Sequence, residues 1–256
     1  MRQAPHIPEL SPDPEGAFPD PEHCQHPDGL IAWGGDLSST RLIKAYTQGI
    51  FPWYEPGSPI LWWSPDPRAV FFPNHYKPAK RLLRTLRRPG WSISVDTQFE
   101  LVISACSEPR GAETGTWITP AMKAAYLELF HLGWAHSVEV WYEGTLVGGL
   151  YGVAMGRVFS AESKFHRRSD ASKIALAYLM VLMKRWSFDL VDCQVSNPHL
   201  IRLGAELITR ASFRQTLFQG LALEATHPQH KPGRWREGWP ALDQVNWRLA
   251  FPKDSE

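Results

Sequence analysis

The sequence predicts an α+β fold with a small N-terminal domain and a larger domain built on a mostly antiparallel sheet. Three observations carry this prediction. Residues 136–165 alternate apolar and polar residues in three runs separated by glycine-containing turns, which indicates a strand meander. The next segment, from Ser169 or Asp170 to Trp186, is apolar on almost every side, which is typical of a helix buried against a sheet. "FDLVDCQV" then reads as one further strand.

This order of antiparallel strands, a buried helix and one more strand is that of the acetyltransferase-like (GNAT-type) fold. The composition supports a globular protein, because 43% of the 256 residues are apolar and 12 are Trp. A net charge of +1 gives no overall attraction to nucleic acid or membranes, so any such attraction must be local.

The localisation predicted from the sequence is cytoplasmic. The three cysteines are widely spaced and odd in number, so they form neither a disulfide framework nor a paired metal site. The first residues lack the apolar core of a signal peptide, and no apolar run is long enough to span a membrane. We therefore expect no membrane association.

The N-terminal part divides into three segments. Residues up to about Gly29 are rich in Pro, Asp and Glu and are interpreted as a loosely ordered arm. A short helix follows, capped by Ser38 or Ser39 and ended by Gly49. Residues 49–73 then combine seven aromatic side chains with six prolines.

Because proline cannot donate to a backbone ladder, we expect residues 49–73 to be a stiff, irregular loop rather than a helix or strand. Its flat side chains are either a seam between two domains or a platform on which planar ligands stack. We place the domain boundary near Asp66, which gives a small domain of residues 1–66 and a larger one of residues 67–256.

The segment "HYKPAKRLLRTLRRPGW" predicts a basic amphipathic helix. Pro78 suits its first turn, and Pro89–Gly90 ends it. Its cations fall within one arc without an acidic partner, which favours phosphate binding over a merely solvated face. These cations are Lys77, Lys80, Arg81, Arg84, Arg87 and Arg88.

Between this helix and the meander we expect a strand, "WSISV", and two further helices. The first begins at Asp96 and the second is capped by Thr119, with Pro120 in its first turn. Trp117 precedes the second helix, where free N–H groups and a planar ring could hold a nucleotide; the alternative is a core tryptophan.

The polar residues of the last two strands are the candidates for chemistry. In "FDLVDCQV", alternation places Asp192 and Gln194 on one face and Cys193 on the other. The carboxylate and amide could orient a substrate amine or simply face water. Glu162 in "SAESKF" is either a charge partner for a cationic substrate, a member of the same polar cluster, or an ordinary exposed strand residue. Cys193 is interpreted as a buried structural thiol.

Several common sites are not indicated. The histidines show no metal-ligand spacing, so no metal site is expected. There is no phosphate-binding glycine loop, and "RRSDASK" stands where an acetyl-CoA enzyme would carry a Gly-x-Gly turn at the start of the long helix.

Taken together, the motifs resemble those of the bacterial leucyl/phenylalanyl-tRNA–protein transferase family, from about Asp28 to Phe218. The motifs that carry the resemblance occur in the family's order: "GLIAWGGDLS", "RLIKAYTQGIFPWY", "ILWWSPDPRAV", "GTWIT", "AHSVEVW", "LVGGLYGV", "SAESKF", "ASKIAL", "DCQV" and "LGAELITR".

The resemblance implies an aminoacyltransferase. Such an enzyme moves Leu, Phe or, less efficiently, Met from aminoacyl-tRNA to the α-amine of a protein that begins with Arg or Lys, which creates an N-end rule degron. The resemblance implies no cofactor, because the ester of the aminoacyl-tRNA is already activated. We expect a monomer.

The resemblance also implies roles for individual residues. Trp53 would stack on the 3′-terminal adenosine of the tRNA, with Trp117 and Tyr46 lining the same donor site. Gln194 would engage the attacking amine and Asp192 would polarise it, both as orienting groups. Glu162 would belong to the same cluster and receive the cationic acceptor terminus. The basic helix would meet the phosphates of the acceptor stem through Lys80, Arg81, Arg84, Arg87 and Arg88.

An apolar pocket for the donor side chain is implied at Leu150, Leu176, Leu179 and Val191. The chain departs from the family's pattern near this pocket. "AESKF" carries Ala161 and Lys164 where glycine and methionine are usual, and Leu179 stands where an aromatic residue can occur.

Two other functions compete with this one. An acetyltransferase-like enzyme that uses acyl-CoA would need the missing Gly-x-Gly turn. A non-catalytic RNA-binding module would keep the aromatic segment and the basic helix but would leave Asp192 and Gln194 without a role.

Overall fold

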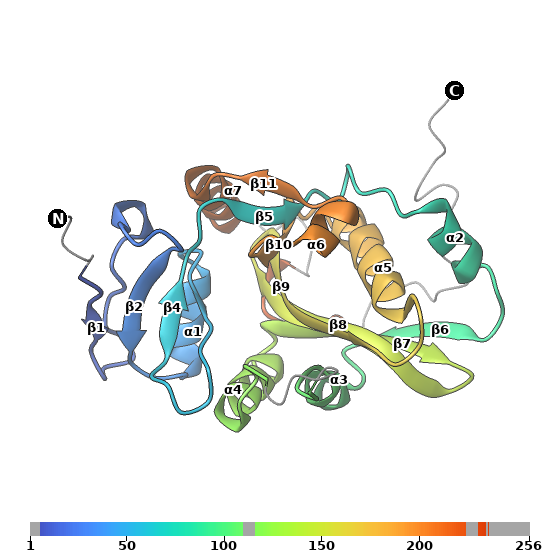
Figure 1. The fold of residues 1–256 in the computed structure, drawn as a ribbon, viewed down its shortest axis with the longest axis horizontal. Coiled ribbons are helices and arrows are strands. Elements are labelled where there is room, and N and C mark those ends of the chain that lie inside the picture. Colours follow the sequence, from blue (N-terminus) through green and yellow to red (C-terminus); the bar gives the residue numbers. More distant parts are fainter. Residues whose placement is uncertain (1–5, 110–115, 224–229, 234, 236–256) are drawn as a thin grey trace.

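The computed structural model describes residues 6–109, 116–223, 230–233 and 235, and it contains a small and a large sheet (Figure 1). The small sheet has the order β1-β2-β4-β3. Its strands are β1 (Glu9–Leu10), β2 (Leu30–Gly34), β3 (Phe51–Pro52) and β4 (Leu61–Trp63). Helix α1 (Ser39–Tyr46) connects β2 to β3 and is capped by the Ser38 side chain, as predicted.

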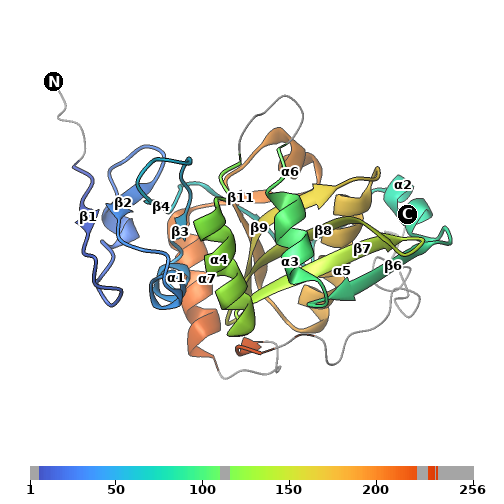
Figure 2. The same ribbon diagram turned by 90° about the horizontal axis from the view of Figure 1, so that it is seen from below.

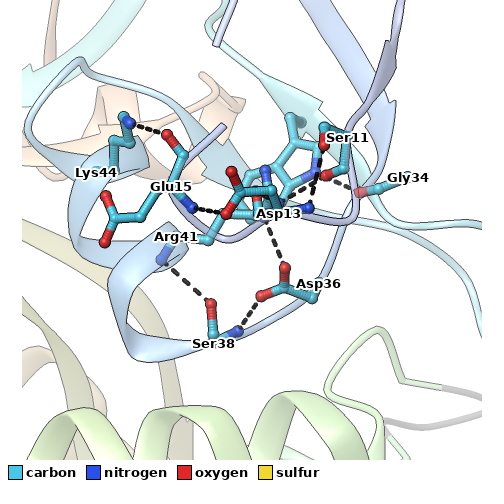
Figure 3. Close-up of polar contacts among 9 residues, drawn as sticks. Ser11, Asp13, Glu15, Gly34, Asp36, Ser38, Arg41 and Lys44 are labelled. Carbon is cyan, nitrogen blue, oxygen red and sulfur yellow. Dashed lines mark hydrogen bonds and ion pairs between the residues drawn. The ribbon is translucent and has the colours of Figure 1, made fainter. Parts of the chain in front are cut away.

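The described part of the N-terminal arm is ordered, so the expectation of a loosely ordered arm is wrong. Strand β1 pairs in parallel with β2, and a short 3₁₀ turn, η1, covers Pro21–His23. The buried Arg41 guanidinium donates to the carbonyl oxygens of Ser11 and Asp13 at 2.8 and 2.6 Å (Figure 3). Backbone carbonyls carry these contacts, so the composition of the arm gave no sign of them.

The aromatic and proline-rich segment is also more regular than predicted, because it contains β3, β4 and β5 (Arg68–Phe71). Pro52 lies in β3, an edge strand of two residues, and the other prolines lie outside the strands. A proline at an edge or beyond a strand end removes no ladder hydrogen bond. The prolines therefore shorten these strands without preventing them.

The large sheet has seven strands in the order β11-β5-β10-β9-β8-β7-β6. Strands β9 and β10 are parallel and the other pairs are antiparallel, which confirms the predicted α+β class with a mostly antiparallel sheet. The strands not yet given are β6 (Trp91–Val95), β7 (Ala135–Tyr142), β8 (Thr145–Met155), β9 (Val158–His166), β10 (Leu190–Gln194) and β11 (Glu206–Ile208).

Helices cover both faces of this sheet. The buried helix α5 (Ala171–Arg185) packs on one face, and α3 (Phe99–Cys106) and α4 (Pro120–His131) pack on the other (Figures 1 and 2). Two apolar cores result, one around α5 and one around α3 and α4, which we call the α5-side core and the α4-side core. The α4-side core continues into the small sheet through Phe51 and Trp62.

The remaining helices are α2 (Lys80–Leu86), α6 (Pro198–Arg202) and α7 (Arg210–Ala222). The basic helix α2 begins after Pro78 instead of including it, and Arg87 and Arg88 lie beyond its last residue. Within the described residues, no helix combines the length and apolarity that crossing a membrane requires. The division into residues 1–66 and 67–256 stays a prediction.

Candidate active site

Two β-bulges on neighbouring strands bring Glu162 and Gln194 together. In β9, Glu162 is an extra residue between the partners of Tyr151 and Gly152. In β10, an extra residue before Gln194 shifts the register, and Gln194 has a positive φ of 64°. The amide nitrogen Nε2 of Gln194 then donates to Oε1 of Glu162 at 2.8 Å. Bulges re-aim side chains in this way beside functional sites.

Glu162 is also the end of a chain of tyrosine hydroxyls. The Tyr126 hydroxyl donates to Oε2 of Glu162 at 2.9 Å and lies 2.6 Å from the Tyr46 hydroxyl. Burial raises the pKa of Glu162 to about 7, against the opposing effect of hydrogen bonds from the two tyrosines. Burial also raises the pKa of both tyrosines well above 10, so their hydroxyls remain protonated.

Asp192 lies beneath this cluster and is fully buried. Its two carboxylate oxygens accept from the Arg68 guanidinium at 2.8 and 2.7 Å, a bidentate pair. Oδ1 also accepts from the backbone N–H of Gln194 at 2.8 Å. Asp192 thus holds the backbone of the bulge in β10, and its role toward the substrate amine stays a prediction.

Arg68 links the two sheets to this pair. Its guanidinium donates to the Gly49 carbonyl at 3.1 Å, and it lies 5.0 Å from the Phe51 ring centroid and 4.3 Å from that of Phe213. Removing either partner would leave an unpaired buried charge.

Sequence reasoning missed Arg68 and Tyr126. A tyrosine in an otherwise apolar helix stripe needs a partner for its hydroxyl, and this was an available signal for Tyr126. For Arg68, a charged residue opening an apolar strand was the only sign, and its partner lies 124 residues away.

The expected donor-pocket residues lie on the other face of the sheet. Leu150, Leu176, Leu179 and Val191 are buried within the α5-side core. Strand β9 pairs with β10 only from Val158 to Ser160, and beyond Ser160 no described residue continues that pairing. The two strands therefore part beside Glu162.

The expected adenosine-binding aromatics lie near the start of α4. Trp117 is half-buried against the α4-side core, while Trp53 is 48% exposed with its ring centroid 5.9 Å from that of Trp63. The Tyr54 hydroxyl lies 3.2 Å from Oγ1 of Thr119, the N-cap residue of α4. A mostly apolar hollow of about 440 Å³ adjoins this contact. The residues that line it are Tyr54, Pro56, Gly57, Thr116, Ile118, Thr119 and Pro120.

Cys193 lies on the other side of β10 and packs against the α5-side core. Burial raises the pKa of its thiol to about 12, which keeps it protonated at neutral pH. This agrees with the structural role expected of it. Among the described residues, no group of three or more His, Cys, Asp or Glu side chains is placed to hold a metal ion.

The basic helix lies at the far end of the large sheet from the small sheet (Figure 1). All five cations expected to meet phosphates are exposed: Lys80, Arg81, Arg84, Arg87 and Arg88. Three of them, Arg81, Arg84 and Arg88, line one hollow together with residues of the turn between β9 and α5. The structure thus separates a polar cluster between the sheets from a distant cationic surface.

Comparison with known protein families gives two adjoining matches. The family described as "Leucyl/phenylalanyl-tRNA protein transferase" matches residues 70–218. The family described as "Leucyl/phenylalanyl-tRNA protein transferase N-terminal domain" matches residues 35–66. The two matches cover β3 and β4 of the small sheet and the large sheet from Val70 onward. They also include the cluster residues Tyr46, Tyr126, Glu162, Asp192 and Gln194.

Curated relatives carry the same description. The leucyl/phenylalanyl-tRNA–protein transferase of Alkalilimnicola ehrlichii is 53% identical over 226 residues, which is 88% of this chain and 86% of that relative. The one from Aromatoleum aromaticum is 51% identical over 230 residues, 90% of this chain and 94% of that relative. Among solved structures, the chain is similar to a GCN5-related N-acetyltransferase from Kribbella flavida, with a TM-score of 0.36 and 13% identity over 63% of this chain and 57% of that one.

Proposed function

Because this chain belongs to the leucyl/phenylalanyl-tRNA–protein transferase family, we propose that its Glu162–Gln194 cluster is where a peptide bond forms. The activity is that of the family: an aminoacyl group moves from an aminoacyl-tRNA to a protein acceptor. The observation that carries the proposed site is the hydrogen-bonded chain from Tyr46 through Tyr126 and Glu162 to Gln194, placed where β9 and β10 part.

The reaction needs little beyond positioning. The α-amine of the acceptor attacks the ester carbonyl, the C–N bond forms, and the ester bond to the 3′-terminal ribose breaks. The amine loses one proton and the departing ribose oxygen gains one, so no coenzyme is required. Since the Nε2 of Gln194 is held by Glu162, its Oε1 is the atom available to accept a hydrogen bond from the amine. Gln194 therefore orients the amine, and Asp192 with Arg68 holds Gln194 in place.

The donor end of the tRNA would lie across the aromatic residues between the sheets. Trp53 and Trp117 offer planar surfaces for the terminal adenosine, and stacking on one ring contributes about 1–3 kcal/mol per base. The donor side chain, Leu, Phe or Met, would pass between the parted strands toward Leu150, Leu176, Leu179 and Val191.

The acceptor specificity would come from Glu162. A carboxylate within reach of the amine site suits a cationic N-terminal residue, Arg or Lys, whose charge would favour its ionised form. The product would be an N-end rule degron. We also propose that the protein acts in the cytoplasm as a monomer, with residues 1–66 and 67–256 as its two domains.

Transfer of labelled Phe or Leu from charged tRNA to a peptide that begins with Arg tests the proposal, and a matched peptide that begins with Ala serves as control. We expect transfer to the Arg peptide alone. Gln194→Ala should lower the rate by about a hundredfold, because the amine is no longer oriented. Gln219→Ala, an exposed change on α7, should leave the rate unchanged.

Two outcomes would contradict the proposal. Equal transfer to both peptides would remove the acceptor specificity assigned to Glu162. Tight tRNA binding without transfer to either peptide would leave a non-catalytic RNA-binding module instead.

A further inference from the structure

Helix α2, strands β6 and β7 and the turn between β9 and α5 enclose a hollow of about 540 Å³. It is rich in guanidinium groups, and we call it the arginine hollow. The residues that line it are Arg81, Arg84, Thr85, Arg88, Trp91, Tyr142, Arg168, Ser169 and Asp170. The resemblance implies phosphate contacts for the cations of α2, but it implies no role for Arg168, which lines the same hollow.

Arg168 forms the wall opposite α2. The centre of its guanidinium lies 3.6 Å from the Tyr142 ring centroid and 5.7 Å from that of Trp91, and the two rings meet edge to face at 5.0 Å. A cation held on an aromatic face keeps its edge N–H groups directed away from the ring. The aromatic pair therefore holds the Arg168 guanidinium in place on the wall of the hollow.

The charge of the hollow is strongly one-sided. Four arginines line it against a single carboxylate, Asp170, and that carboxylate already accepts from Lys173 at 2.8 Å. The neighbouring Arg167 differs. It pairs with Glu108 at 2.6 Å and is not among the residues that line the arginine hollow. Like charges brought together in one hollow repel each other, so the arrangement suits an anionic ligand with more than one charge.

The position of the hollow points to an extended ligand. It lies beside α2, at the end of the large sheet farthest from the small sheet and from the aromatic residues between them (Figure 1). A short peptide acceptor or a single nucleotide bound at Glu162 would not extend to this end of the sheet. A tRNA bound by its 3′ end between the sheets presents a continuous phosphate backbone to the rest of the protein.

The family resemblance already implies phosphate contacts for Arg81, Arg84 and Arg88. We propose that Arg168, held by Tyr142, is a further residue of this hollow that binds backbone phosphates of the aminoacyl-tRNA. Arginine suits this role because its planar fork matches phosphate oxygens two at a time. The inference rests on the proposed function and adds one residue to it. Arg168 lies just after the last residue of β9, the strand that carries Glu162.

The test compares Arg168→Gln with Arg167→Gln, which removes the same charge one residue away. We expect Arg168→Gln to weaken tRNA binding by about three- to tenfold at 0.1 M salt and to reduce the slope of log Kd against log salt by about one. KM for the charged tRNA should rise, while KM for the Arg peptide stays the same. Arg167→Gln should change none of these quantities.

A minimal donor separates this proposal from the proposed function. A 3′-aminoacyl-adenosine carries the ester and the base but no acceptor-stem phosphates, so Arg168→Gln should use it as well as the wild type does. Tyr142→Phe keeps the ring and should bind tRNA normally, whereas Tyr142→Leu should bind it as weakly as Arg168→Gln. Equal thermal melting temperatures would show that each variant is folded.

The two proposals fail in different ways. If wild type transfers Phe to the Arg peptide but Arg168→Gln binds tRNA with unchanged affinity and salt slope, Arg168 is not a phosphate-binding residue, the inference is overturned and the proposed function stands. If Arg168→Gln is equally impaired with the minimal donor, Arg168 acts on the fold or the active site instead, and the inference is overturned. If wild type transfers from neither donor, the proposed function itself fails.

Discussion

At the scale of single residues, the two carboxylates of the site differ in what surrounds them. Asp192 is fully buried and bound to Arg68, whereas Glu162 faces hydroxyl and amide groups. The bidentate guanidinium fixes the Asp192 carboxylate in place. Burial raises the pKa of Glu162 to about 7, so that carboxyl group can change protonation near neutral pH. We therefore expect Asp192 to act as a positioning residue and Glu162 to interact with the substrate.

This difference predicts a large stability effect at Asp192. Asp192→Ala leaves the buried Arg68 guanidinium without its partner, so the free energy of unfolding should fall by about 3–5 kcal/mol. Urea denaturation followed by tryptophan fluorescence measures it. Activity lost in this variant therefore cannot be assigned to chemistry until its folding has been measured.

A matched aspartate provides the control. Asp189 pairs with Arg157 at 2.6 Å, but both side chains are partly exposed, at 29% and 25%. Asp189→Ala should cost about 1 kcal/mol or less, because solvent screens this pair. Equal losses at the two positions would show that burial does not set the cost of removing an ion pair here.

A second prediction concerns the pH dependence of stability. The pKa of Glu162 is about 7 in the folded protein and ordinarily 4.5, so the folded state holds the proton more tightly. The resulting stabilisation is complete below pH 4.5 and is lost as the pH rises through 7. Between pH 5 and 8 the wild type should lose at most about 3 kcal/mol more than Glu162→Gln does.

Urea denaturation of both proteins across this pH range would check the sign as well as the size. A glutamine keeps one oxygen acceptor and replaces the other with an N–H donor. It can accept from Gln194 and donate to the Tyr126 hydroxyl, which can then donate to Tyr46, so Glu162→Gln removes the titration while both contacts keep a partner. Parallel curves for the two proteins would mean that Glu162 titrates as an ordinary exposed carboxylate.

At the scale of elements, local sequence signals predicted most of the fold. Ser38 and Thr119 cap α1 and α4 as expected, and the three strands of the meander and helix α5 lie where their apolar patterns place them. These features depend on residues close together in the chain. The resemblance to the transferase family supplied the roles of distant residues, and those roles stay proposals.

The elements that the sequence did not predict depend on distant or backbone contacts. Simple alternation placed Asp192 and Gln194 on one face, but the bulge in β10 decides where Gln194 lies. The order of the N-terminal arm comes from Arg41, which binds carbonyl oxygens about 30 residues earlier in the chain. Neither a bulge nor a carbonyl partner has a reliable composition signal.

Gly148 in β8 is a further feature whose structural reason could not be predicted from the sequence. A Cβ at Gly148 would lie 2.6 Å from that of Ala171 in the first turn of α5, so this position allows helix and sheet to approach closely. The motif "LVGGLYGV" was useful as a family signature, but only the structure explains why a glycine stands at its centre.

At the scale of the whole molecule, the site belongs to both sheets. Tyr46 comes from α1 beside the small sheet, Tyr126 from α4 and Glu162 from the large sheet, and the first two lie in one continuous apolar core. The Arg68 guanidinium, which binds Asp192, also donates to the carbonyl oxygen of Gly49. The relative position of the two sheets therefore determines the geometry around Glu162.

The last described residue, Trp235, packs against the large sheet and the segment before α3. Its ring stacks on His136 at 3.8 Å between centroids, and its backbone N–H donates to Asp96 at 3.0 Å. It is 1% exposed and packs in the α5-side core, so Trp235→Ala should lower the free energy of unfolding by about 3–5 kcal/mol.

Trp53→Ala is the opposite case: with 48% of that residue exposed, stability should change little while KM for charged tRNA rises. Urea denaturation and the transfer assay on both variants check this contrast. If Trp235→Ala proves as stable as the wild type, the α5-side core does not depend on this tryptophan.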